Sequence, residues 1–349
     1  MTASNQSPAR PAVRLGPLAR WETLLVILLV GLIAAGARMS PFFISGGNFA
    51  NLTSSVMEIA IMALPMTLVI VMADIDLSVE SMVGLAGAVL GTLVVAGVPL
   101  PLAIPVVLAV GALGGLLNGL LVTRAGLPSL VVTLGTLALF RGLANVLLGP
   151  TVISVWPDWF TAFGFGTIDG SPIPFTLVVF LVLVVVFWAV AHATWIGRQV
   201  FAIGKNAAAS RYSGVRVNSM RNWMFVITGM VSALAGIILV ARFSSARNDN
   251  GTGMTLTVVT VVLLGGVDIN GGKGSIPGVV LAVFVLALLQ NILRLAGVSS
   301  EYQGIAVGLL LIFSVIVPQL ARQTRGAVDR ARRSRRPPAG PIASGEVTA

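Results

Sequence analysis

The stretch Phe175-Thr-Leu-Val-Val-Phe-Leu-Val-Leu-Val-Val-Val-Phe-Trp-Ala-Val-Ala-His-Ala193 contains no Asp, Glu, Lys or Arg and is long enough to cross a lipid bilayer as one helix. The whole chain is similar in character: of its 349 residues, 56% are hydrophobic and 10% charged, and its mean hydropathy is +0.97. A soluble domain carries about 25% charged residues, so this chain has too little polar surface to cover a globule in water. The composition predicts an all-α, polytopic membrane protein.

Apolar runs of about 20 residues predict about ten membrane-spanning helices. The predicted spans lie near residues 22–40, 56–74, 79–98, 102–122, 129–148, 175–193, 223–241, 254–268, 276–296 and 304–320. The run 254–268 is short enough to be a half-helix or a re-entrant segment. The run from Leu24 to Ala37 is interpreted as a span rather than a signal peptide, because no clear small-residue cleavage site follows it.

The positions of the 22 Lys and Arg residues predict the orientation of the chain. Only Arg38, Arg242 and Arg247 fall in outside segments if the N-terminus is cytoplasmic, and Arg141 and Arg294 fall within spans. The inside segments then hold Arg10, Arg14, Arg20, Arg124, Arg198, Lys205, Arg211, Arg216, Arg221, Lys273, Arg322, Arg325, Arg330, Arg332, Arg333, Arg335 and Arg336. This excess of inside cations satisfies the positive-inside rule and predicts that both termini are cytoplasmic.

The chain is predicted to have three parts. Residues 1–20 form a disordered cytoplasmic arm, residues 21–320 form the transmembrane domain, and residues 321–349 form a basic cytoplasmic tail. The run Arg330 to Arg336 is rich enough in arginine to suggest nucleic-acid binding. It follows a span directly on the cytoplasmic side, however, so attraction to anionic lipid headgroups is the favoured interpretation, and no nucleic-acid partner is expected.

The longest inside loop, about 194–222, is predicted to contain a docking helix. Its glycines Gly197, Gly204 and Gly214 flank the Ala-rich run 206–213, and Asn206 is a suitable N-cap. A plain basic connector is the alternative. The docking interpretation is favoured because a compact helix between two glycine turns is more structure than a tether needs.

Most catalytic chemistry is excluded by composition. With 0 Cys and 1 His, the chain offers no disulfide framework, no thiol nucleophile and no Cys-ligated zinc site. The glycine-rich run 265–275 fails the phosphate-loop spacing, because Val267 stands where the first Gly is required and Gly274 where Ser or Thr is required. The chain is therefore expected not to be an enzyme and to need no cofactor or metal.

Charged groups at membrane depth are costly and often functional. Glu58 and Arg294 lie near span ends, so they are expected to snorkel to the interface. Arg141 lies deeper in its span and is expected to be paired or to face a cavity.

The stretch Met72-Ala-Asp-Ile-Asp-Leu-Ser-Val-Glu-Ser81 breaks two spans with three acids. An ordinary polar turn is one interpretation, with Ser78 capping the next helix and Glu80 in its first turn. The alternative is an ion-coupled secondary transporter that uses Asp74, Asp76 and Glu80 as cation or proton ligands.

Polar side chains in the middle spans are candidates for a substrate path, although hydrogen bonds between helices explain such residues equally well. The substrate-path candidates are Asn118, Thr133, Thr136, Arg141, Asn145, Asp76, Ser78 and Asn291. Small residues accompany them, as in Gly111-Ala-Leu-Gly-Gly115, and predict close helix packing.

Several motifs in order resemble the permease subunits of bacterial ABC importers for ribose-type monosaccharides, a group that includes the autoinducer-2 and rhamnose import permeases. The resemblance covers about residues 56–320. Its motifs are Asp74-Ile-Asp-Leu-Ser-Val-Glu-Ser81, Asn118-Gly-Leu-Leu-Val122, Pro128-Ser-Leu-Val-Val-Thr-Leu-Gly-Thr136, Arg141-Gly142, Gly197-Arg198, Ala202-Ile-Gly-Lys-Asn206, Ser213-Gly-Val215, Gly265-Gly-Val-Asp268 and Gly271-Gly-Lys-Gly-Ser275. Within the group, Ala63-Leu-Pro-Met-Thr-Leu-Val-Ile-Val71 and Ser244-Ser-Ala-Arg-Asn-Asp249 look most like the autoinducer-2 or rhamnose permeases.

The resemblance implies a multi-pass protein of the bacterial inner membrane that moves a sugar or sugar-like molecule. It also implies its partners: ABC ATPase subunits that use the ATP, a second permease chain in a homo- or heterodimer, and a periplasmic sugar-binding protein. The ATPase-contacting loop of the family corresponds here to Gly197, Arg198, Gly204, Asn206, Ala209, Arg211 and Gly214.

The chain departs from the family pattern at a few positions. Ala73 and Asp74 stand where a Gly-Gly pair is usual, and Glu80 and Lys205 each replace a usual Gly. These changes bear on the identity of the substrate more than on the class of subunit.

Overall fold

The computed structural model describes residues 21–314 and 316, and most of these residues are helical. The elements are α1 (Trp21–Met39), α2 (Gly46–Ser54), α3 (Met57–Val71), α4 (Val79–Val95), α5 (Leu100–Thr123), α6 (Ser129–Leu148), α7 (Asp158–Phe165), α8 (Phe175–Trp188), the π-helix η2 (Ala189–Ala193), α9 (Trp195–Lys205), α10 (Ala207–Tyr212), α11 (Val217–Phe243), α12 (Met254–Leu264) and α13 (Ile276–Leu295). A further helix covers Ser300–Ser314. Over these residues, β-structure is limited to the isolated bridges Ile153–Ala246 and Thr167–Pro174. The predicted all-α class is confirmed.

Each predicted span falls on a helix, but the helices differ in length. Six elements are long and apolar enough to cross a membrane: α1, α5, α6, α8 with η2, α11 and α13. Helices α2 and α3 are bent by 46° relative to each other, and if this pair is one broken span, the number of spans is seven. Three predicted spans correspond to shorter apolar helices: α4, α12 and Ser300–Ser314. The short run 254–268 contains an 11-residue helix, as its length suggested. The predicted arm 1–20, the tail 321–349 and the end of the last span lie outside the described residues.

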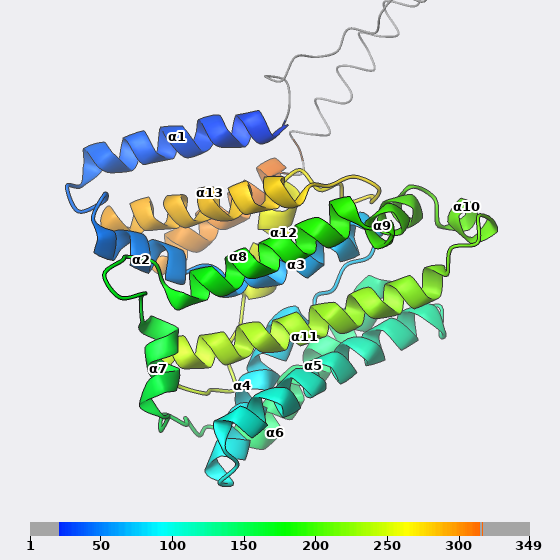
Figure 1. Cartoon of the computed structure of the whole chain (residues 1–349), viewed down its shortest axis with the longest axis horizontal. Helices are drawn as coiled ribbons and strands as arrows, with labels where there is room; N and C mark the ends of the chain where they lie inside the picture. The colour runs from blue at the N-terminus through cyan, green and yellow to red at the C-terminus, as the bar shows by residue number, and fades with distance from the viewer. Residues whose placement is uncertain (1–20, 315, 317–349) are drawn as a thin grey trace, which may run out of the picture.

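The long helices lie side by side, and α3 packs against α8, α11 and α13 (Figure 1). Helices α1 and α13 pack together on one side, and α11 packs against both α3 and α5 on the other. The short helix α10 projects at one end of the molecule, whereas α2 and α7 lie at the opposite end (Figure 1). Both ends are formed by connections between long helices, so they are the candidate aqueous faces.

Helix α3 is the core of the fold. Every residue from Met57 to Val71 is buried, and the helix contacts α8, α11, α12 and α13. A helix that is apolar all round is suited to such a position, because it presents hydrophobic side chains to protein on every face.

Helices α5 and α11 approach each other through glycines. A Cβ atom at Gly115 would lie 2.1 Å from the carbonyl oxygen of Phe225, and one at Gly229 would lie 2.2 Å from the carbonyl oxygen of Gly111. The close packing predicted from Gly111 to Gly115 is therefore present, since only small residues let two backbones approach this closely.

We expect alanine at Gly115 and at Gly135 to change stability in opposite directions. Gly115→Ala forces α5 away from α11 and should lower the free energy of unfolding by about 1–3 kcal/mol. Gly135 lies in α6, where an added Cβ meets nothing within 4 Å, so Gly135→Ala should raise stability by up to about 1 kcal/mol through helix propensity. Thermal unfolding of the purified variants in detergent measures both stability changes. Equal shifts of the unfolding temperature in the two variants would contradict the packing argument.

Candidate functional site

The chain unwinds between α3 and α4, over residues 72–78, and this break is the centre of the candidate site. Ala73 has φ 63°, a left-handed backbone conformation that is uncommon for a residue with a side chain. The Asp76 carboxylate then accepts a hydrogen bond from the Ser78 backbone N–H at 2.9 Å, a local turn that competes with helix. Ser78 stands at the N-cap position of α4 and Glu80 lies in its first turn, as suggested, but the Ser78 hydroxyl makes no capping hydrogen bond.

A chain of hydrogen bonds runs from this break into α5 and α6. The Ser78 hydroxyl donates to Asp76 Oδ1 at 2.6 Å, and Asn118 Nδ2 donates to Ser78 Oγ at 2.8 Å. Thr136 Oγ1 in turn donates to Asn118 Oδ1 at 2.7 Å. We call these four side chains the polar chain; each is at most 4% exposed. Buried polar groups need such partners, because an unsatisfied one is costly.

Helix α6 also holds the backbone of the break. Thr133 Oγ1 donates to the Ile75 carbonyl oxygen at 3.3 Å, and the Ile75 N–H donates to Ser129 Oγ at 3.2 Å. The structure thus brings five of the eight substrate-path candidates together at one place: Asp76, Ser78, Asn118, Thr133 and Thr136.

The three acids of the break have separate partners. Asp74 forms an ion pair with Arg221 of α11, with 2.9 Å between Oδ2 and Nε. Glu80 Oε2 accepts the Thr255 N–H at 3.0 Å, at the positive end of the α12 dipole. The acids therefore do not converge on a shared cation site, and among residues 21–314 and 316 no group of three or more His, Cys, Asp or Glu side chains is placed to hold a metal.

Arg141 and Asn145 lie on α6 but bind a different segment, the loop between α11 and α12. Arg141 Nη1 donates to the carbonyl oxygens of Asn248 and Asn250 at 2.6 and 3.1 Å. Asn145 Oδ1 accepts from Asn248 Nδ2 at 2.9 Å. Arg141 was expected to be paired or to face a cavity; its Nη1 is bound to backbone carbonyl oxygens, whereas its buried Nη2 has no hydrogen-bond partner among the described residues.

Asn291 lies away from the break, on α13. It exchanges two side-chain hydrogen bonds with Asn48 of α2, at 3.1 and 2.8 Å. This amide pair fastens the short helix α2 to α13.

Glu58 corrects a sequence expectation. It is 1% exposed and receives two hydrogen bonds from Arg242, at 2.8 and 3.2 Å. The snorkelling prediction for Glu58 is wrong, because the carboxylate is paired inside the protein. A signal existed in the sequence: the predicted topology places Glu58 and Arg242 at the same depth with opposite charges. Arg294, by contrast, is exposed at the end of α13.

The predicted loop 194–222 is more helical than expected: it contains α9 and α10, and α11 already begins at Val217. Asn206 caps α10, accepting the Ala209 N–H at 2.9 Å, so the predicted N-cap is confirmed. Arg198 and Arg211 are exposed, and Arg211 donates to Asn218 at 3.3 Å. The loop thus presents cations on a folded surface.

Glycines seat this loop against the membrane helices. A Cβ atom at Gly197 would lie 2.0 Å from the Ala191 carbonyl oxygen, and one at Gly204 only 1.8 Å from that of Val71, the last residue of α3. Gly214 has φ +84°, which favours glycine for a different reason, the left-handed turn. Helix α9 therefore touches the start of the 72–78 break directly.

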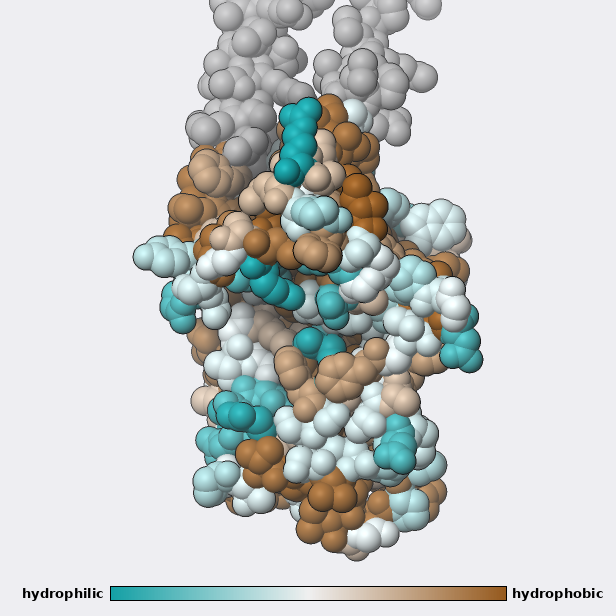
Figure 2. All heavy atoms as spheres, turned by 90° about the vertical axis from the view of Figure 1, so that its left-hand side faces the viewer, coloured by the Kyte–Doolittle hydropathy of each residue, from teal (hydrophilic) through white to brown (hydrophobic). Residues whose placement is uncertain are grey.

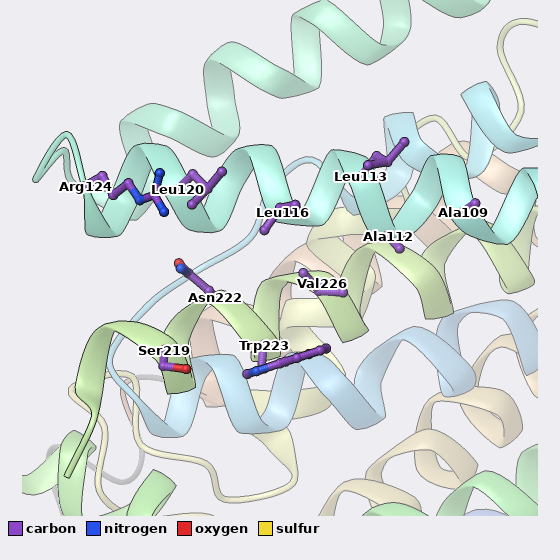
Figure 3. A pocket seen from close by; sticks show the side chains of 10 residues that line it. All are labelled: Ala109, Ala112, Leu113, Leu116, Leu120, Arg124, Ser219, Asn222, Trp223 and Val226. Atoms are coloured by element: carbon purple, nitrogen blue, oxygen red, sulfur yellow. The ribbon is translucent and has the colours of Figure 1, made fainter.

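A cavity of about 570 Å³ lies between α5 and α11. Figure 3 shows its polar groups, Arg124, Ser219 and Asn222, at one end and apolar side chains such as Leu113 toward the other. None of the polar-chain residues lines this cavity. In this structure the polar chain is enclosed by protein, as a hydrogen-bonded joint between α4, α5 and α6.

Thr136→Val should destabilise the protein, because it leaves the buried Asn118 Oδ1 without its donor. We expect a loss of about 1–3 kcal/mol. Thr260→Val is the matched control: Thr260 is equally buried, but its hydroxyl only donates to the Leu256 carbonyl oxygen within its own helix. Thermal unfolding in detergent compares the two, and a loss for the control as large as for Thr136→Val would contradict the proposed joint.

Comparisons with known proteins identify the family of this chain. The family model described as "Branched-chain amino acid transport system / permease component" matches residues 48–315. The chain belongs to this permease family. It is a multi-pass permease subunit of the bacterial inner membrane, and the family is a transport component rather than an enzyme.

Its relatives include autoinducer 2 import system permease proteins LsrD. The protein from Enterobacter sp. (strain 638) is 39% identical over 302 residues, covering 85% of this chain and 92% of the relative. Those from Yersinia enterocolitica and Escherichia coli (strain K12) are 40% identical, each covering 85% of this chain and 91% of the relative. No solved structure shows a significant match. The resemblance to ribose-type importer permeases is confirmed.

Proposed function

We propose that this subunit carries autoinducer-2, or a sugar-like molecule such as rhamnose or ribose, across the inner membrane with energy from a separate ATPase. The cargo follows from the relatives, which are named for autoinducer-2 import and match 85% of the chain. An uncharged, hydroxyl-rich cargo also suits a path lined by amide and hydroxyl groups, since these offer weak, exchangeable hydrogen bonds.

The proposal also assigns each partner to one end of this subunit. ATPase subunits bind α9 and α10 on the cytoplasmic side, where both termini also lie, and a periplasmic sugar-binding protein delivers cargo at the opposite end. A second permease chain, identical or different, completes the pathway. The placement of the cations supports these faces, because the end with α9 and α10 holds the basic loop.

The polar chain is proposed to form part of the path when the helices separate. In the structure it is closed, so cargo passage requires α4, α5 and α6 to move apart at the 72–78 break and exchange their mutual hydrogen bonds for bonds to cargo hydroxyls. ATP binding would drive this exchange between two arrangements. Arg141, Asn145 and Asn291 are proposed to line the path nearer the outside.

The observation that carries the mechanism is the contact of Gly204 with the Val71 carbonyl oxygen. The Gly272 N–H donates to the same oxygen at 2.8 Å, so α9, the end of α3 and the loop before α13 meet at one point. A displacement of α9 by a bound ATPase therefore acts directly on the break that holds the polar chain.

Reconstitution tests the function. The chain is assembled in proteoliposomes with its ATPase, second permease chain and binding protein, and uptake of radiolabelled autoinducer-2 and ribose is measured. We expect uptake only with ATP and the ATPase. Uptake by the single chain that follows a proton or sodium gradient would instead support the ion-coupled alternative with Asp74, Asp76 and Glu80, and would overturn the proposal.

Gly204→Ala should uncouple ATP hydrolysis from uptake. The added Cβ displaces α9 from Val71, so we expect the ATPase to bind and hydrolyse ATP while the uptake rate falls by about tenfold, which corresponds to about 1.4 kcal/mol in the activation barrier for transport. Gly308→Ala is the control, because its Cβ would meet nothing within 4 Å. Uptake per ATP equal to that of the unmodified chain would contradict the coupling role of this contact.

A further inference from the structure

A second cavity, of about 350 Å³, lies between α2, α7 and the ends of α11 and α13. Figure 2 faces this end of the molecule and shows hydrophilic side chains in the middle of the face, between more hydrophobic surface above and below. Its uncharged polar lining consists of Asn48, Asn51, Ser54, Ser55 and Asn291. We call this the outer cavity. Such a density of amides and hydroxyls is unusual next to membrane helices, where apolar side chains dominate.

The charges of the outer cavity suit a neutral ligand. Arg242 lines it but is already bound through two hydrogen bonds to the buried Glu58, so this pair contributes no net charge. Arg294 adds a single cation. Phosphate sites usually gather several charge-assisted donors, whereas here uncharged donors and acceptors predominate.

The walls are positioned before any ligand arrives. The reciprocal hydrogen bonds between Asn48 and Asn291 fix two sides of the cavity. Among the described residues, the side chains of Asn51 and Ser54 form no hydrogen bonds with the protein, so their polar groups are free to face a ligand. Phe165 adds an exposed ring, whose negative face suits the polarised C–H groups of a sugar.

We propose that the outer cavity is an entry site for a small, neutral, hydroxyl-rich molecule. The cavity lies at the end of the molecule opposite α10 (Figure 1), and the cation distribution predicts that this end is outside. Its volume fits a molecule of sugar size. The inference rests on the proposed function, because it assigns the cavity to the same cargo before that cargo reaches the 72–78 break. Binding here is weak and exchangeable, since no more than a few hydrogen bonds form on an open surface.

Cysteine labelling tests the entry site. The chain contains 0 Cys, so Ser54→Cys introduces a single thiol into an otherwise unreactive chain with little change in size. The assembled importer is placed in right-side-out vesicles of phosphatidylcholine, and a membrane-impermeant thiol reagent is added outside. We expect labelling of this chain, slowed about threefold or more by millimolar autoinducer-2 or ribose.

Thr151→Cys is the matched control. Thr151 is exposed in the loop after α6 and does not line the outer cavity, so its labelling should be unaffected by cargo. A second variant, Asn51→Leu, should weaken the cargo protection of Ser54→Cys while leaving its labelling rate without cargo unchanged.

Three results would overturn the inference. The first is that Ser54→Cys is not labelled from outside, and the second is that cargo protects Ser54→Cys and Thr151→Cys equally. The third is that phosphatidylglycerol in the vesicles protects Ser54→Cys and cargo does not, which would assign the cavity to a lipid headgroup. Uptake by the unmodified importer, measured in parallel, separates the two proposals. Uptake without protection refutes the entry site alone, and protection without uptake supports the site while refuting the proposed transport function.

Discussion

A break in a buried helix is the constraint on which this structure depends. Helix α3 is surrounded by protein, and where it unwinds at residues 72–78 the carboxylates of Asp74 and Asp76 are buried, so they need partners within the protein. Neighbouring helices supply the partners: α5 and α6 through Asn118 and Thr136, and α11 through Arg221. The break therefore ties α3 and α4 to three neighbouring helices, α5, α6 and α11.

Helix α3 is held at both of its ends. At one end, Gly204 of the loop 194–222 rests on the last carbonyl of α3. At the other, the Glu58–Arg242 pair fastens the start of α3 to the end of α11 beside the outer cavity. Helix α3 thus runs between the loop that we propose binds an ATPase and the cavity that we propose receives cargo.

Much of the candidate site was visible in the sequence because it follows from local pattern. The acids in an apolar run predicted the break, the glycines and Asn206 predicted the capped helix α10, and depth in its span predicted a partner for Arg141. The partners themselves were not predicted, although the predicted topology places Glu58 and Arg242 at the same depth with opposite charges. Glu58 was expected at the interface, because hydropathy along one segment carries no information about Arg242, which lies far away in the chain.

The sequence by itself determined the all-α class, the positions of the apolar helices and the family, since these depend on composition, period and motif order. Only the tertiary structure decided which polar residues meet. It gathered Asp76, Ser78 and Asn118 at the break but placed Asn291 against Asn48 in another part of the protein. The reason is physical: in a bilayer each buried polar group must find a partner, and which partner it finds is set by how helices distant in sequence pack together.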